Sequence, residues 1–491
     1  MSVEASHAAL SDDGELSRRR RVGVLLICSM SLLVVSLDVT IVNVALPSIG
    51  RDFHASLSGL QWTVDAYTLV LASFLMLSGS TADRLGRRRT FITGLVMFIS
   101  GSLLCSLAPN LTALIVFRML QALGGSMLNP VAMSIITNTF TNPKERAQAI
   151  GVWAAVMGFS MALGPIIGGL LVGSVGWRSI FWINIPIGLI AVVLALRFVP
   201  ESRAAVARKV DARGQVLVVV LLASLTFGII QAPSYGWSSA STFGVFALSL
   251  VAFVVLVAWE RRCAEPLINV RFFRSAPFST ATLIAVASFA GLSGFLFLNT
   301  LYLQEVRGLS PLGAGIDTLP MAAMTLLLPP VAGRVVGHYG ARLPLLLGGL
   351  SLLVGSLMLV RLDVATPFTW LFCAYVVFGV GFGVVNPPIT SAAVSGMPRA
   401  QAGVASGIAS TSRQVGATLG VAIVGALVGS KIGVNSRVGF VLATRGGWWF
   451  LAGCGGAVLL LGLLGTSKWA RATADRTARE LNPEYFEGRE S

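Results

Sequence analysis

Three ionisable side chains, Asp38, Asp65 and Arg118, lie inside long apolar stretches of the sequence. Charged groups are costly inside a membrane, so ionisable residues in a span are candidates for proton or substrate binding. If the stretches span a bilayer, all three lie about six or seven residues from the outer end of their span, about 9–10 Å deep. Two carboxylates around one guanidinium group leave one negative charge over, and that carboxylate is a natural proton acceptor. A fixed ion-pair network that only neutralises buried charge is an equally good interpretation.

The composition indicates a polytopic membrane protein embedded in a lipid bilayer. The chain has 491 residues, of which 55% are hydrophobic and only 12% are charged, and its mean hydropathy is +0.80. A soluble protein carries about twice that charged fraction. The formal charge of +15 is spread over short inter-span loops, without a basic stripe interleaved with aromatic residues, so no nucleic-acid partner is expected.

Metal and thiol chemistry are not favoured. The five cysteines are isolated and the three histidines lie far apart in loops or in the N-terminal tail. The scarcity of histidine and the lack of clustered cysteines also argue against a membrane enzyme, and no cofactor is expected.

Fourteen apolar runs of about 20 residues predict fourteen membrane-spanning helices. Most of the 36 lysines and arginines fall in loops on one side of this arrangement, which the positive-inside rule assigns to the cytoplasm together with both termini. The expected limits are 22–46, 59–79, 90–108, 111–137, 147–174, 177–198, 213–232, 240–260, 277–303, 312–333, 343–361, 366–390, 402–429 and 446–467.

The chain is expected to divide into two six-helix halves and an insertion. Residues 1–21 and 468–491 are interpreted as cytoplasmic tails, and residues 199–276 as a linker with two extra helices. The halves are then residues 22–198 and 277–467, with a weak internal repeat of glycines and arginines after the tenth span.

One short polar segment, residues 79–90, separates the second span from the third. It is called the arginine segment below. Four arginines within six positions place it at the cytoplasmic membrane surface, and its glycines permit a sharp turn. Asp83 either caps the following helix or holds the neighbouring guanidinium groups. A loop that only orients the protein is the simpler alternative. The residues singled out are Gly79, Asp83, Arg84, Gly86, Arg87 and Arg88.

Several motifs in order resemble one transporter family over essentially the whole chain. The pattern G-x-x-x-D-R-x-G-R-R-R of the arginine segment resembles the signature loop of the major facilitator superfamily. Residues 37–47 and 177–188 are similar to motifs of its fourteen-helix drug:proton antiporters, and residues 118–125 to its fourth-span motif R-x-x-Q-G-x-G, with Ala122 in place of the first glycine. The antiporter motif of the fifth span, typical of exporters, is matched by Gly158, Gly164, Pro165, Gly168 and Gly169.

The resemblance implies an all-α membrane protein with the major facilitator fold, in which two six-helix halves face each other across a central cavity. It further implies that Arg118, with Asp38 and Asp65, couples transport to protons, and that the arginine segment holds the cytoplasmic side closed. Candidate cavity residues are Asn43, Trp62, Gln121, Trp153, Met157, Asp317 and Arg413. Aromatic and methionine side chains of this kind are more often core packing. Asp317 fits an interfacial charge better, and Arg413 a structural role.

The sequence therefore predicts a monomeric secondary exporter of hydrophobic or cationic, antibiotic-like small molecules in a bacterial cell membrane, driven by the proton gradient. A dedicated exporter of one natural product is the main alternative. An uptake permease shares the fold but not the fifth-span motif. A transport-inactive sensor would be expected to carry a sizeable soluble domain, which the short loops leave no room for.

Overall fold

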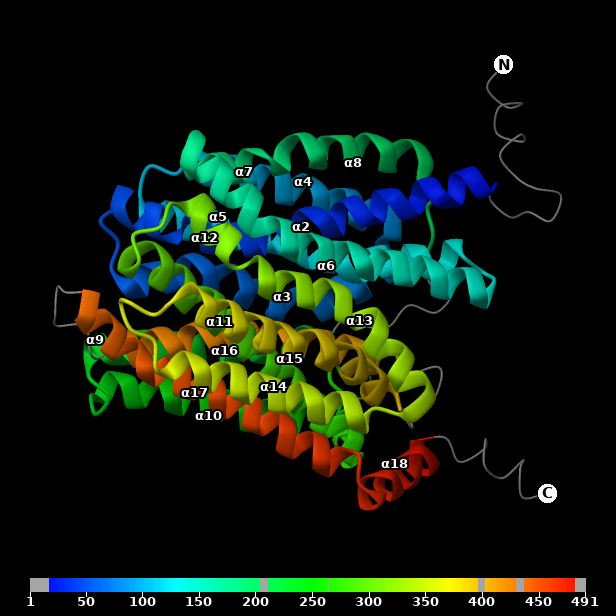
Figure 1. Cartoon of the computed structure of the whole chain (residues 1–491). Coiled ribbons are helices and arrows are strands. Elements are labelled where there is room, and N and C mark those ends of the chain that lie inside the picture. Colours follow the sequence, from blue (N-terminus) through cyan, green and yellow to red (C-terminus); the bar gives the residue numbers. More distant parts are fainter. Residues whose placement is uncertain (1–16, 204–210, 264, 396–401, 430–436, 482–491) are drawn as a thin grey trace, which may run out of the picture.

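The computed structural model describes residues 17–203, 211–263, 265–395, 402–429 and 437–481. Over these residues the chain is a bundle of long helices without strands, and the predicted all-α fold is confirmed. Figure 1 shows the long helices side by side, with α2 beginning and α17 ending at the same end of the bundle. This end is called the tail end below, and the opposite end the far end.

Fourteen helices in the described residues are long and apolar enough to cross a membrane, as predicted. Three shorter elements accompany them: η1 (Val270–Arg274), α12 (Pro311–Asp317) and α18 (Lys468–Leu481). The membrane-length helices are α2 (Arg18–Asp52), α3 (Leu57–Leu85), α4 (Arg87–Ser106), α5 (Leu111–Thr139), α6 (Pro143–Ser174), α7 (Ser179–Trp182) continued by α8 (Asn184–Phe198), α9 (Ala212–Tyr235), α10 (Ala240–Glu260), α11 (Ala276–Leu301) continued by η2 (Tyr302–Val306), α13 (Leu319–Tyr339), α14 (Arg342–Val360), α15 (Phe368–Val394), α16 (Ala402–Gly429) and α17 (Arg437–Gly465).

Several helix limits differ from those predicted, because apolar runs mark the hydrocarbon layer and not the ends of helices. The helix predicted at 59–79 continues to Leu85, and the last span begins at Arg437 instead of residue 446. The tenth span was expected from residue 312, but α12 ends at Asp317 and the spanning helix α13 begins at Leu319. Residues 1–16, 204–210 and 482–491 of the predicted tails and linker lie outside the described residues.

The helices form two groups and a hairpin. Helices α2–α8, called the first half, gather on one side of Figure 1. Helices α11 and α13–α17, which together with α12 are called the second half, gather on the other side, whereas α12 itself lies against α6 of the first half. Helices α9 and α10 pack on each other, and α9 also contacts both α3 and α16. The inserted hairpin therefore touches one helix of each half.

One buried hydrogen bond and one aromatic contact hold the hairpin against α3. On α9, Gln215 donates from Nε2 to the carbonyl oxygen of Ser73 on α3 at 2.7 Å, and Phe227 packs on Trp62 with ring centroids 6.1 Å apart. At the tail end, α18 docks through Thr473, whose hydroxyl accepts a hydrogen bond from the backbone N–H of Ala276 at 3.0 Å. For the residues of this last helix, only a cytoplasmic tail was predicted.

Candidate functional site

Two of the three predicted intramembrane charges form a buried ion pair. Asp38 on α2 and Arg118 on α5 are each 1% exposed, and Arg118 Nη1 lies 2.5 Å from Asp38 Oδ2. Arg118 Nε also donates to the carbonyl oxygen of Thr63 on α3 at 3.4 Å. The guanidinium carbon lies 4.1 Å from the ring centroid of Tyr67, a cation–π contact in a buried site. The pair therefore ties three helices of the first half together.

A ring of neutral polar groups completes the coordination of Asp38. Gln121 Nε2 donates to Asp38 Oδ1 at 2.8 Å, and Asn184 Nδ2 donates to the same oxygen at 3.1 Å. Both amides also donate to the hydroxyl of Ser102, at 2.6 and 3.1 Å. The Gln121 carbonyl oxygen accepts from Arg118 at 2.6 Å. Both oxygens of Asp38 are thus satisfied, as a buried charge requires.

Sequence reasoning did not place Asn184, Ser102 or Tyr67 in this network. Asn184 belongs to the motif at residues 177–188, but an isolated amide does not reveal its partner. Ser102 is one of many small polar residues on α4, and only its complete burial distinguishes it here. Gln121, a predicted cavity residue, lies in the network and is 0% exposed.

Asp65, the third predicted charge, is not part of this cluster. The ring of Tyr67 faces Arg118, and Asp65 lies two residues before Tyr67 along α3. At 3.6 residues per turn, two residues rotate a side chain by about 200°, so Asp65 projects from the opposite side of the helix. The prediction that two carboxylates surround one guanidinium group is therefore wrong.

The surroundings of Asp65 place it between the two halves. Gln61, one turn before it, donates to the carbonyl oxygen of Ala422 on α16 at 3.0 Å. Thr68, on the following turn, shares a 2.9 Å hydroxyl hydrogen bond with Thr418 on α16. Asp65 is 0% exposed, and neither of its carboxylate oxygens has a hydrogen-bond partner in the structure. It is a buried acid at an interface that must open if the halves move apart.

Further contacts join the halves towards the far end. Arg51 on α2 pairs with Glu305 on η2 at 2.9 Å between Nη1 and Oε1. Gln304 Nε2 donates to the carbonyl oxygen of Val44 at 2.9 Å. Together with the α3–α16 bonds, these contacts close the bundle around Asp65 on its far-end side.

The arginine segment is mostly helical, with one residue at the turn. Helix α3 runs through Asp83 to Leu85, and α4 begins at Arg87. Gly86 between them has φ = +114°, a conformation that favours glycine. Asp83 Oδ1 pairs with Arg87 at 2.9 Å, while Gly86, which has no side chain, provides no side-chain cap for α4. Of the two roles predicted for Asp83, it performs the second.

A residue that the sequence did not single out, Glu201, organises the rest of this segment. Its Oε1 accepts from the backbone N–H of Arg88 at 3.1 Å, at the amino-terminal end of α4, where a negative charge is favourable. Arg88 Nη2 donates to the carbonyl oxygen of Leu196 at 2.5 Å. The exposed Arg84 and half-buried Gly79 complete the segment. These contacts join α3 and α4 to Leu196 of α8 and to Glu201, which follows α8.

The glycines of α6 bring this helix close to both halves. A Cβ atom on Gly164 would collide with Thr40 of α2, and one on Gly168 would lie 3.4 Å from Ile41 Cα. On another face, a Cβ on Gly169 would lie 2.6 Å from Leu312 Cα of α12. The backbone of Pro165 packs closely against Gly315 of the same helix α12. Gly158 faces Leu326 of α13, with 3.2 Å from its ideal Cβ to Leu326 Cδ1. The predicted motif thus allows α6 to pack between the halves.

The other predicted cavity residues are scattered. Asn43 is 4% exposed and leaves its Oδ1 without a partner. Trp62 packs on Phe227 of the inserted hairpin, and Trp153 packs against the core of the first half with its indole N–H unpaired. Met157 is half-buried.

Two charges of the second half, Asp317 and Arg413, remain separate from the first-half network. Arg413 donates to the hydroxyl of Thr390 on α15 at 2.6 Å and lies 5.9 Å from the ring centroid of Phe289 on α11. Both partners belong to its own half, which agrees with a structural role. Asp317 ends α12, and partial burial raises the pKa of its carboxyl group, against the opposing effect of Arg307.

Fourteen membrane-length helices in two groups, with an ion pair in one group and an unpaired acid between the two, define a polytopic membrane protein built as a transporter. The model of the Major Facilitator Superfamily matches residues 28–421. The chain belongs to the major facilitator superfamily.

Several similar proteins are named for drug resistance or export. The chain is 36% identical over 395 residues to the multidrug resistance protein Stp of Mycobacterium tuberculosis, covering 80% of this chain and 73% of that protein. It is 38% identical over 394 residues, with the same coverages, to the tetracenomycin C resistance and export protein of Streptomyces glaucescens. The predicted relationship to the drug:proton antiporters of the superfamily is confirmed by these matches.

A solved structure of a peptide transporter POT in complex with sulfate matches with a TM-score of 0.65 at 15% identity, covering 93% of this chain and 95% of that one. At this identity the likeness shows the fold alone.

Proposed function

We propose that this protein exports hydrophobic, antibiotic-like compounds from a bacterial cell in exchange for protons, by alternating access between its two halves. The observation that carries the proposal is the 36–38% identity over 80% of the chain to proteins named for multidrug resistance and for tetracenomycin C export. In this proposal the protein works as a monomer without a cofactor, and the tail end with its many arginines faces the cytoplasm.

Asp65 is the proposed proton carrier. An ionised carboxylate without partners costs several kcal/mol to bury. In the conformation described here, Asp65 is sealed between α3 and α16 and is best accommodated as the neutral acid. When the α3–α16 bonds break, water reaches the carboxyl group and the proton exchanges. Protonation therefore favours closure of the far end, which links proton uptake to the conformational change.

Asp38 and Arg118 take a supporting role in this proposal. The carboxylate is already held by Arg118, Gln121 and Asn184, so protonating it requires that the ion pair break. The pair fixes α2 against α5 and so gives the first half the rigidity that a rocking motion needs.

The substrate range distinguishes two candidates. Stp is named for multidrug resistance, whereas other relatives carry the name of one compound each, tetracenomycin C or methylenomycin A. A dedicated exporter of one natural product is therefore the second candidate for this chain.

The experiment is drug-panel resistance in a pump-deficient bacterium at matched expression. It compares the native chain with Asp65→Asn, Asp38→Asn and the control Asp475→Asn, an exposed acid on α18. We expect resistance with the native chain and the control, and loss of resistance with Asp65→Asn at normal protein levels. Resistance to several unrelated compounds indicates a multidrug exporter, and resistance to one indicates a dedicated exporter. A fully active Asp65→Asn variant would refute the proton-carrier assignment.

A further inference from the structure

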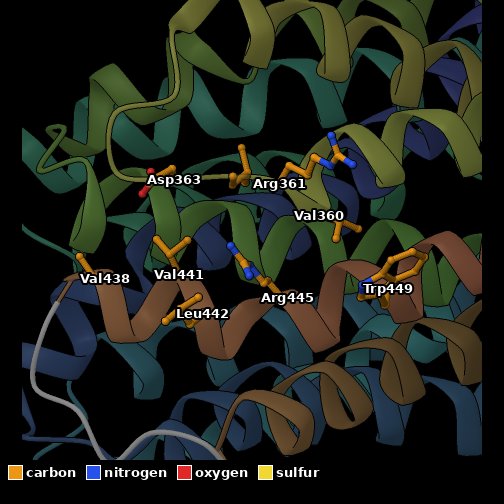
Figure 2. A pocket seen from close by; sticks show the side chains of 9 residues that line it. Val360, Arg361, Asp363, Val438, Val441, Leu442, Arg445 and Trp449 are labelled. Atoms are coloured by element: carbon orange, nitrogen blue, oxygen red, sulfur yellow. The ribbon is translucent and has the colours of Figure 1, made fainter.

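A pocket opens at the far end of the second half, away from the ion pair and from Asp65. It lies between α17 and the residues that follow α14 and has a volume of about 610 Å³. Figure 2 shows Arg445 on α17 as one wall, with Arg361 and Asp363 on the other. Its lining is otherwise apolar: Val360, Leu362, Val438, Val441, Leu442 and Trp449.

The pocket lies at the level where a membrane's hydrocarbon layer ends. About 20 helical residues cross the hydrocarbon layer, and counted back from the tail-end terminus of α17 at Gly465 they reach the position just after Arg445. Helix α14 ends at Val360, so Arg361 lies at the same boundary. Both arginines therefore sit at headgroup level whichever way the protein is inserted.

One face of α17 is exposed along this pocket. Val438, Leu442, Arg445 and Trp449 follow a spacing of three and four residues and share one face of α17. Val438, Leu442 and Trp449 are 57%, 50% and 59% exposed. Trp449, about one turn beyond Arg445 towards the tail end, lies on the hydrocarbon side of this boundary, where an acyl chain can reach it. An exposed tryptophan beside them suits a membrane interface.

The pocket carries a net positive charge, and its arginine side chains are available to a ligand. Within the part of the chain that the structure describes, neither Arg361 nor Arg445 forms an ion pair. Asp363 is engaged in its own turn, where Oδ1 accepts from the backbone N–H of Val364 at 2.6 Å. Two guanidinium groups against one carboxylate leave an excess positive charge above an apolar wall.

We propose that this pocket binds an anionic phospholipid, with the phosphate between Arg361 and Arg445 and an acyl chain along Trp449. Guanidinium groups pair with phosphate oxygens, and the apolar wall distinguishes a lipid from a free phosphate ion. The lipid would bridge α14 and α17. This site is independent of the proposed export function.

The test is quenching of Trp449 by brominated lipid in nanodiscs that contain the full chain. The Trp449 signal is the difference between the native chain and Trp449→Phe. Bromine on phosphatidylglycerol is compared with bromine on phosphatidylcholine. We expect a preference for phosphatidylglycerol of about five-fold in relative affinity per arginine, about 25-fold for both.

Three variants decide the outcome. R361Q/R445Q should abolish the preference, R361K/R445K should keep most of it, and R261Q/R262Q, which removes two exposed arginines at the tail end, should keep all of it. Equal quenching by both lipids in the native chain, or an intact preference in R361Q/R445Q, would overturn the proposal. Loss of quenching on addition of glycerol phosphate would also overturn it, since the pocket would then be a site for free phosphate.

Discussion

Replacing one member of the buried pair should destabilise the protein far more than replacing one member of an exposed pair. In Asp38→Asn, the guanidinium group of Arg118 stays 1% exposed without its counter-ion. Removal of one partner of a buried pair costs about 3–5 kcal/mol. The matched control is Asp52→Asn, which breaks a pair of similar length, 2.8 Å to Arg178, whose side chains are 43% and 40% exposed. There we expect a loss of about 0–1 kcal/mol.

The assay is a double-mutant cycle on the free energy of unfolding. Unfolding is monitored by tryptophan fluorescence during titration with a denaturing detergent. Arg118→Met should cost about as much as Asp38→Asn, because it strands the carboxylate instead. The double variant leaves only neutral groups, and about 1–3 kcal/mol should be lost from its unpaired amides. It should therefore be no less stable than either single variant. Additive losses, or a loss in Asp38→Asn as small as in Asp52→Asn, would refute the interpretation of this pair as a coupled buried network.

Three more predictions concern close packing and motion. Gly169→Ala should cost about 1–3 kcal/mol of stability and slow dye efflux at matched expression, because its Cβ meets α12. The control Gly173→Ala, whose Cβ would have nothing within 4 Å, should leave stability and efflux unchanged. Equal efflux by the two variants would contradict this prediction. Gly86→Ala should lower the melting temperature, since φ = +114° is unfavourable for alanine, and an unchanged melting temperature would count against the observed turn. In a chain without its native cysteines, Thr68→Cys with Thr418→Cys should cross-link under oxidation and stop transport until reduced, and transport by the cross-linked protein would exclude separation of α3 from α16.

The number and order of the helices could be predicted because a bilayer imposes a simple requirement on the sequence. Each span needs about 20 apolar residues, and the loop charges alternate from one side to the other. The ends could not be predicted in the same way. Helix α3 continues to Leu85, because its polar last turn lies beyond the apolar run that marks the span, and α12 separates from α13 although no polar run divides them.

The candidate site was predictable in part. Depth and opposite charge indicate that Asp38 can meet Arg118, and the structure pairs them. The direction of Asp65 could not be predicted, because it depends on which face of α3 packs on α5 and which on α16. Asn184 and Glu201 were missed for a related reason: a single polar residue does not reveal a partner that lies far away in the chain.

The most direct test of the proposed function is proton exchange by the purified protein in proteoliposomes. A drug-like dye is added to vesicles with an imposed pH gradient, and dye movement and lumenal pH are recorded together for the native chain, Asp65→Asn and Asp475→Asn. The proposal predicts uphill dye movement with a matching proton flux in the native chain and the control. Asp65→Asn should lose both while retaining dye binding. Gradient-driven dye transport at the native rate by Asp65→Asn would contradict the claim that a proton on Asp65 drives export.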